Sequence, residues 1–172
     1  NVTVAYTDNY VYLGTPMSNS PLTMQIQDHM STKHAHCLKF TSFLTKNSDA
    51  PYIVKETVWQ SALKSSLMFS CETWLCTNLR PAEAPYMSSL KQLLGVRSTT
   101  CNDLALLESG VPSPRSYIET RQRNFLHKLV RRPGFSSSYI GHTMEEARRV
   151  RSPMGLRIQA LLSLGDSGDQ QL

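Results

Sequence analysis

The chain has 172 residues, of which 40% are hydrophobic and 18% are charged, and its net charge is +5. This composition supports one sizeable core but not two large ones, and the apolar runs are far shorter than the ~20 residues of a membrane span, so no membrane partner is expected. Four cysteines are too few for a disulfide framework, which favours a reducing, intracellular compartment, nuclear or cytoplasmic. No leader-like stretch follows Asn1, and we expect an internal piece of a longer protein.

The N-terminal segment has the alternation of a β-hairpin. Every second residue at the start is apolar: Val2, Val4 and Tyr6. Asp8 and Asn9 suit a tight two-residue turn before the β-prone run 10–13, and residues 14–21 predict a loop. Because an isolated hairpin is marginally stable in water, we expect it to pack on helices or to join strands that lie upstream.

Helical periodicity dominates the following segment. It predicts a long helix from Leu22 to Lys46 and a second from Ile53 to Phe69, with the break at 47–51 making them an antiparallel pair. The apolar positions of the first are Ile26, Met30, Cys37, Phe40 and Leu44. Those expected to face inward on the second are Val54, Val58, Ala62 and Leu63.

Proline and glycine mark the ends of the next two helices. Pro85 suits a first helical position and Gly95 the residue past a helix end, which predicts a short helix over Tyr86–Leu94. Residues 99–110 repeat this pattern, with Gly110 past the helix end.

The helix after Ser113 carries the most informative chemistry. Ser113 is a typical N-cap, Pro114 suits the first helical position, and the helix is expected to end near Arg132. At about 100° per residue, Arg121, Lys128 and Arg132 fall within about 40° of one another. The apolar stripe expected beside these cations consists of Ile118, Phe125 and Leu129. Further cations on other sides are Arg115, Arg123 and Arg131.

Two short helices are predicted after it. Thr143 and Glu146 fit a capping box, in which each side chain satisfies a backbone donor, and the helix continues to about Arg151. The last helix begins after Ser152, and the tail from Gly165 is expected to be disordered. The apolar side of the last helix should comprise Leu156, Ala160, Leu161 and Leu164.

These elements predict a mainly α fold, a helical bundle with a short N-terminal β-hairpin. The expected regions are a hairpin over 1–14, a helical region over 20–110, a basic helical extension over 111–164 and a disordered tail over 165–172. The charge follows the same division, because residues 111 to 160 hold ten lysines and arginines against three glutamates. Such a local excess of arginine favours a phosphate-rich partner, and the alternative is a solvated helix face.

No catalytic or metal constellation stands out. The aspartates are isolated, and no pair of carboxylates is spaced to hold the metal ion that phosphoryl transfer needs. The only residues that resemble a metal cluster are His34, His36, Cys37, Cys71 and Cys76. Their spacing does not suit a zinc site, whose ligands come in close pairs within turns.

Several motifs, each weak singly, follow one another in a recognisable order. They are Tyr12-Leu13-Gly14, the segment Leu67 to Trp74, Leu93 to Val96, Thr100-Cys101-Asn102, Leu107 to Pro112, and Tyr117 to Arg121 with Phe125 and Lys128. Their order and spacing, over about residues 2–132, resemble the region downstream of the polymerase core in non-LTR (LINE-type) retrotransposon reverse transcriptases. Cys71 is a minor departure, since relatives often have a small residue there.

The resemblance implies a thumb-like helical region and an extension that hold template and primer. The hairpin ending at Tyr12, Leu13 and Gly14 would be the last palm hairpin, which supports the primer. The metal-binding aspartates of this family lie upstream of that motif, so the chain should be inactive alone, and Mg²⁺ is expected only for the complete polymerase. No cofactor is expected for this chain.

We therefore expect a non-catalytic fragment of an RNA-directed DNA polymerase that grips RNA or an RNA/DNA duplex, with the palm and fingers upstream as further partners. The predicted nucleic-acid-binding residues are Arg121, Arg123, Lys128, Arg131 and Arg132. Two alternatives remain open: a stand-alone helical protein-interaction module derived from such an element, and a decayed fragment without function.

Overall fold

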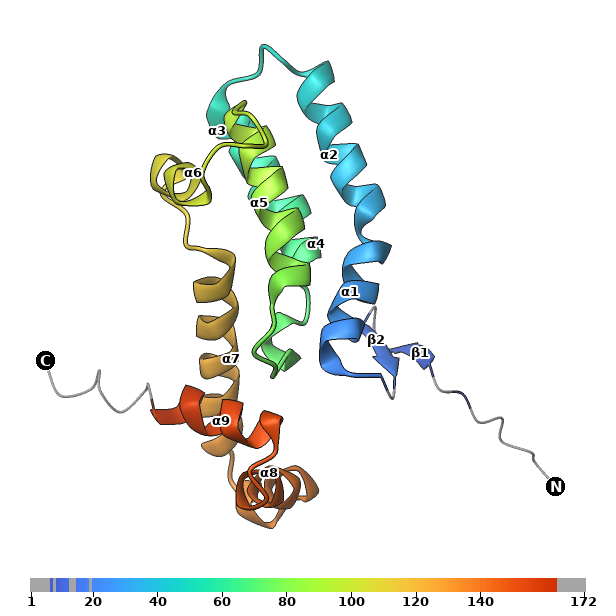
Figure 1. Cartoon of the computed structure of the whole chain (residues 1–172), viewed down its shortest axis with the longest axis vertical. Coiled ribbons are helices and arrows are strands. Elements are labelled where there is room, and N and C mark those ends of the chain that lie inside the picture. Colours follow the sequence, from blue (N-terminus) through green and yellow to red (C-terminus); the bar gives the residue numbers. More distant parts are fainter. Residues whose placement is uncertain (1–6, 8, 13–14, 19, 164–172) are drawn as a thin grey trace, which may run out of the picture. The chain divides into compact units, whose positions relative to one another are not determined.

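The computed structural model describes residues 7, 9–12, 15–18 and 20–163. These residues are mainly helical, so the mainly α fold predicted from the sequence is confirmed. Within these ranges, no helix combines the length and the apolar character that crossing a membrane requires. Figure 1 shows the elements in chain order.

The chain divides into two compact units. The first runs to Phe69 and resumes over Leu79–Val111, and the second comprises Ser70–Asn78 and the chain from Pro112 onward. The short segment Ser70–Asn78 thus belongs with the C-terminal helices, whereas the sequence placed it inside the helical region 20–110.

The first unit is built around α5. Its elements are β1 (Asn9–Tyr12), β2 (Thr15–Ser18), α1 (Leu22–Thr32), α2 (His34–Lys46), α3 (Tyr52–Val58), the π-helix η1 (Trp59–Lys64), α4 (Ser65–Leu67), α5 (Arg80–Leu94) and α6 (Asn102–Ser109). Helix α5 packs against α1, α2, α4 and α6. The large buried side chains of this core include Ile26, Phe40, Trp59, Leu67, Tyr86 and Leu90.

The β-hairpin differs from the predicted one. Strand β1 pairs antiparallel with β2, with Asn9 opposite Ser18 and Tyr12 opposite Thr15. Residues 15–18 were predicted as loop, so this prediction is wrong. The predicted partner strand over residues 2–7 lies almost entirely outside the described residues.

The single helix predicted from Leu22 to Lys46 is also wrong, because Lys33 separates α1 from α2. Just before it, Ser31 Oγ donates to the Asp28 carbonyl and Thr32 Oγ1 donates to the His29 carbonyl, at 2.8 and 2.7 Å. Such local side-chain bonds compete with the helical ladder, which favours a break at this point.

The inward face predicted for residues 53–69 is wrong for Val54 and Ala62, which are exposed, and right for Leu63, which is buried. Val54 is 45% exposed, whereas Trp59 is fully buried and donates from Nε1 to Ser89 Oγ at 2.9 Å. Its ring meets Tyr86 edge-on, with centroids 5.3 Å apart. The π-helix turn η1 changes the helical register here, so a pattern read at 3.6 residues per turn misses Trp59 and selects Val54 and Ala62 instead.

For α5, the start predicted from Pro85 is wrong, whereas the end predicted from Gly95 is correct. The helix begins at Arg80, with Pro81 in its first turn and Pro85 inside it, so the predicted start at Tyr86 is wrong. A proline in the first turn removes an N–H that has no helical partner, which explains why Pro81 is tolerated. Gly95 adopts φ +69° past the helix end, as predicted.

In its described part, up to residue 163, the second unit has three α-helices and two short 3₁₀ turns. Its elements are η2 (Cys71–Thr73), α7 (Pro114–Val130), η3 (Phe135–Ser137), α8 (Tyr139–Arg149) and α9 (Pro153–Ser163). Leu126 of α7 packs with Ile158 and Leu161 of α9 in the core. Leu156 is 51% exposed and Ala160 is exposed, so two of the positions predicted to be apolar contacts face outward.

The caps predicted for α7 and α9 are confirmed, whereas the one predicted for α8 is wrong. Ser113 Oγ accepts from the Ser116 N–H at 3.1 Å, and Ser152 Oγ accepts from the Gly155 N–H at 3.0 Å. Helix α8 instead begins after Ser138, so the predicted capping box is wrong. Its Thr143 lies inside the helix and donates to the Tyr139 carbonyl at 2.8 Å.

Candidate nucleic-acid interface

A groove on the second unit gathers several of the predicted cations. It encloses about 410 Å³ and is formed by η2 and the middle and end of α7. Its lining residues are Glu72, Arg121, Asn124, Phe125, His127, Lys128 and Arg131. We call it the α7 groove.

Gln122 fixes η2 against α7 and thereby shapes the groove. Its side chain is fully buried, and Nε2 donates to the carbonyls of Trp74 and of Cys71, the latter at 3.4 Å. Its Oε1 accepts from Arg157 Nη2 at 3.2 Å, and the same nitrogen donates to Glu119 Oε1 at 3.0 Å. The buried amide therefore uses both its donor and its acceptor, as buried polar groups require.

Glu72 and Arg121 face each other across the groove at a loose distance. Arg121 Nη2 lies 3.8 Å from Glu72 Oε2, and the two side chains are 28% exposed for Glu72 and 54% exposed for Arg121. This distance exceeds that of a hydrogen bond, so the guanidinium keeps its donors for another partner.

Three cations near the end of α7 have no acidic partner in the described part of the chain. Lys128 and Arg131 line the groove and are exposed, and Arg132 is exposed just past the last helical residue. None of the three lies within 4.0 Å of a carboxylate oxygen among the residues that the structure describes. Their charges are accordingly open to an external anion.

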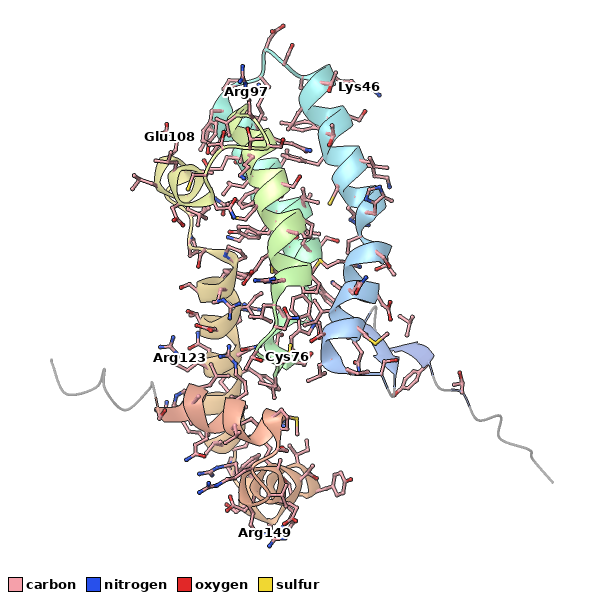
Figure 2. The ribbon with its side chains drawn as sticks, in the orientation of Figure 1. Lys46, Cys76, Arg97, Glu108, Arg123 and Arg149 are labelled. Atoms are coloured by element: carbon pink, nitrogen blue, oxygen red, sulfur yellow. The ribbon has the colours of Figure 1, made fainter. Side chains whose placement is uncertain are left out.

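Arg123 lies elsewhere on α7. It is half-buried, does not line the groove, and its Nε has no hydrogen-bond partner within the described ranges. Successive helical positions diverge by about 100°, which places Arg123 on roughly the opposite side from Arg121. Figure 2 labels it on α7. The structure thus brings together Arg121, Lys128 and Arg131, but not Arg123.

The cations of α8 are paired within the helix. Arg149 donates to both oxygens of Glu146, at 2.8 and 2.6 Å, and Arg148 Nη1 lies 3.4 Å from Glu145 Oε2. These hydrogen bonds lower the pKa of Glu146 and raise the pKa of Arg149. Arg149 is labelled on α8 in Figure 2.

The predicted primer-support residues fall at the edge of the described chain. Tyr12 is the last residue of β1, and Leu13 and Gly14 lie outside the described residues. Their role stays a prediction that follows from the resemblance.

The thiols and carboxylates do not form a reactive or metal-binding site in the described ranges. All four cysteines are described, and each is a free thiol. Burial raises the pKa of Cys71 to about 12, so this thiol stays protonated. Within the described ranges, no three His, Cys, Asp or Glu side chains come together to hold a metal ion.

The sequence analysis did not identify Gln122, which supports the groove, or Glu72, which lines it, and it misjudged the position of Phe125. Gln122 lies in the buried row Ile118, Gln122 and Leu126, where a polar residue hid the pattern. Phe125, predicted to pack inward, is 37% exposed and lines the groove. Glu72 comes from a distant segment, and no local signal in the sequence pairs it with α7.

Comparisons with known proteins identify no relative: no protein-family model, no curated protein and no solved structure matches the chain. The ordered motifs in the sequence are therefore the support for the resemblance to reverse transcriptases. The geometry of the α7 groove is a separate observation, which does not depend on that resemblance.

Proposed function

We propose that this chain binds nucleic acid, holding RNA or an RNA/DNA duplex by its phosphates against the α7 groove. The observation that carries the proposal is the convergence of Arg121, Lys128 and Arg131 on one groove, where two of the three have no acidic partner among the described residues. In the context of the resemblance, the chain is the non-catalytic thumb and extension of an intracellular retrotransposon reverse transcriptase. Palm and fingers upstream would supply catalysis and hold its Mg²⁺.

The chemistry of the groove suits phosphate better than an acidic protein surface. Arginine presents a planar fork that matches two phosphate oxygens, and helical spacing sets Arg121, Lys128 and Arg131 along one stretch of about 15 Å. A nucleic-acid backbone repeats its charge along such a line, whereas protein carboxylates rarely do. Contacts of this kind carry no base information, so binding should be similar for different sequences.

A salt titration tests the proposal. The variant Arg121→Ala/Lys128→Ala/Arg131→Ala should flatten the slope of log affinity against log salt for an RNA/DNA duplex by roughly two to three, since each phosphate contact contributes about 0.9. Arg132→Ala should remove up to one further contact.

The matched control removes the same number of charges elsewhere. Arg97 is an exposed loop residue, and Arg148 and Arg149 are already paired, so their triple alanine variant should change the slope by less than about one. Circular dichroism should show that both variants remain helical. An unchanged slope in the groove variant, with its fold intact, contradicts the proposal.

A second candidate function rests on an apolar hollow of the first unit. It encloses about 540 Å³, and its lining includes Leu104 and Leu107, which are 60% and 80% exposed. An exposed apolar surface of this kind is typical of a protein-binding site, as the interaction-module alternative expects. That function predicts weak duplex binding by the parent chain and little change in the groove variant.

A further inference from the structure

We infer that the α7 groove holds an unpaired nucleotide, with its base stacked on Phe125 and its flanking phosphates on the cations either side. This inference rests on the proposed function and names the form of nucleic acid that the groove accepts. The ligand is a single strand, whether RNA or DNA.

The first observation is the position of the Phe125 ring. On α7 the buried row is formed by Ile118, Gln122 and Leu126, all at most 1% exposed, and Phe125 lies beside that row at 37% exposed. Its ring therefore contributes to a wall of the groove rather than only to the core. A duplex presents phosphates to such a surface, because its base faces are covered by neighbouring bases; only an unpaired base offers a free face for stacking.

The second observation is the spacing of charge around the ring. Arg121 lies four residues before Phe125, and Lys128 lies three residues after it, so each is about one helical turn away. A nucleotide whose base covers the ring would have a cation near the phosphate on each side. An aromatic ring between two cations is the combination by which single-strand-binding surfaces hold a base and its backbone together.

The third observation is the carboxylate on the η2 side. Glu72 lines the same groove and is 28% exposed, and its Oε2 lies 3.8 Å from Arg121. A carboxylate repels phosphate but accepts hydrogen bonds from the N–H groups of a base edge. The base edge is therefore directed toward η2 and Glu72, while the flanking phosphates lie on Lys128 and on the exposed guanidinium of Arg121. A surface that bound only the phosphate backbone of a nucleic acid would be weakened by a carboxylate at this position, because like charges repel.

The experiment compares three probes of equal length: a single-stranded RNA, a single-stranded DNA and an RNA/DNA duplex with blunt ends. Phe125→Leu keeps an apolar side chain and removes the aromatic face. Affinity for a single strand should fall roughly 5- to 100-fold, the range for losing one stacked base, while duplex affinity changes less than about twofold. Phe69→Leu is the matched control, since Phe69 is an exposed phenylalanine outside the groove, and it should change neither.

A second variant gives a direct signal of stacking. Phe125→Trp should keep single-strand affinity, and the fluorescence of the introduced indole, measured as the difference from the parent, should be quenched by a single strand but not by the duplex. A loss of affinity in Phe125→Leu that is equal for all probes, or binding of a single strand without quenching, overturns the inference. Loss of the salt dependence in the triple groove variant would still support the proposed function, so the two failures are distinguishable. If the affinities for the RNA strand and the DNA strand differ, the strand that binds more tightly identifies the source of the nucleotide.

Discussion

Helices α7 and α8 belong to the same compact unit and both carry arginines, yet they use them differently. In α8, Arg148 and Arg149 each follow a glutamate by three residues, a spacing that brings both pairs into contact along the helix. In α7 the glutamate Glu119 pairs with Arg157 of α9, which leaves the cations at the other end of α7 without a near acid among the described residues. The charge that a partner can reach is therefore set by the spacing of acids and bases rather than by the net count.

The two helices also differ in how they pack within the unit. Helix α8 approaches α9 so closely that a Cβ at Gly155 would overlap the carbonyl of Ala147. Helix α7 buries Gln122 and Leu126 on one side and keeps the groove on the other. We infer that α8 mainly supports the unit, whereas α7 provides the binding surface.

The largest expected effect is a loss of stability when a side chain is added where α8 and α9 meet. Gly155→Ala should destabilise the second unit by about 3 kcal/mol, because the backbone of Ala147 cannot yield as a flexible side chain would. Urea unfolding measures the loss. Gln159→Ala, an exposed change on α9, should cost less than about 0.5 kcal/mol. Equal stability of the two variants would show that α8 does not support α9 in this way.

A smaller loss is expected where α7 holds η2. Gln122→Leu leaves the buried carbonyl of Trp74 and the guanidinium of Arg157 without the amide, which should cost about 1–3 kcal/mol of stability. It should also weaken single-strand binding, because Glu72 would no longer be held at the groove. Asn124→Ala, an exposed change on the same helix, controls for helix propensity. Unchanged stability in Gln122→Leu would remove this residue from the support of the groove.

Gln122 also shows how far the sequence could predict the site. Periodicity located α7 and put Arg121 and Lys128 on one edge of it, and the structure agrees. Of the predicted apolar stripe, Ile118 is buried as expected, but Phe125 is exposed, because the buried Gln122 breaks the apolar pattern. The buried Gln122 donates to the carbonyl of Trp74, and no local pattern predicts a contact 48 residues away.

The ends of the helices also show which features the sequence can predict. Ser113, Ser152 and Gly95 act through their own backbone geometry or through a bond to a neighbour, and all three were predicted correctly. The start of α5 was not, since tolerance of Pro85 inside a helix depends on packing around it. Local chemistry predicted these three ends, although it did not predict the cap of α8 or the break at Lys33.

The contrast between free and paired cations predicts a gain of binding. Glu145→Gln/Glu146→Gln frees Arg148 and Arg149, so duplex affinity at low salt should rise about three- to tenfold and the salt slope should steepen by up to about two. Asp103→Asn/Glu108→Gln makes the same change in net charge on α6, whose carboxylates are exposed. Its effect should be smaller, because it releases no arginine of α8. A similar gain in both variants would mean that net charge alone governs binding.

The smallest effect tests the pairing of Glu146 itself. Its hydrogen bonds to Arg149 lower the pKa of the carboxyl below the ordinary value of 4.5. The stabilisation from this pair should therefore be complete above the unfolded-state pKa and be lost as the pH falls through the lower folded-state pKa. Carboxyl carbon NMR of Glu146 should show a midpoint below 4.5, and Arg149→Gln should raise that midpoint. Arg151→Gln is the control, since Arg151 lies past the end of α8 and makes no ion pair among the described residues. A midpoint that Arg149→Gln leaves in place would mean that Arg149 is as free in solution as Lys128, and the distinction between the two helices would then lose its basis.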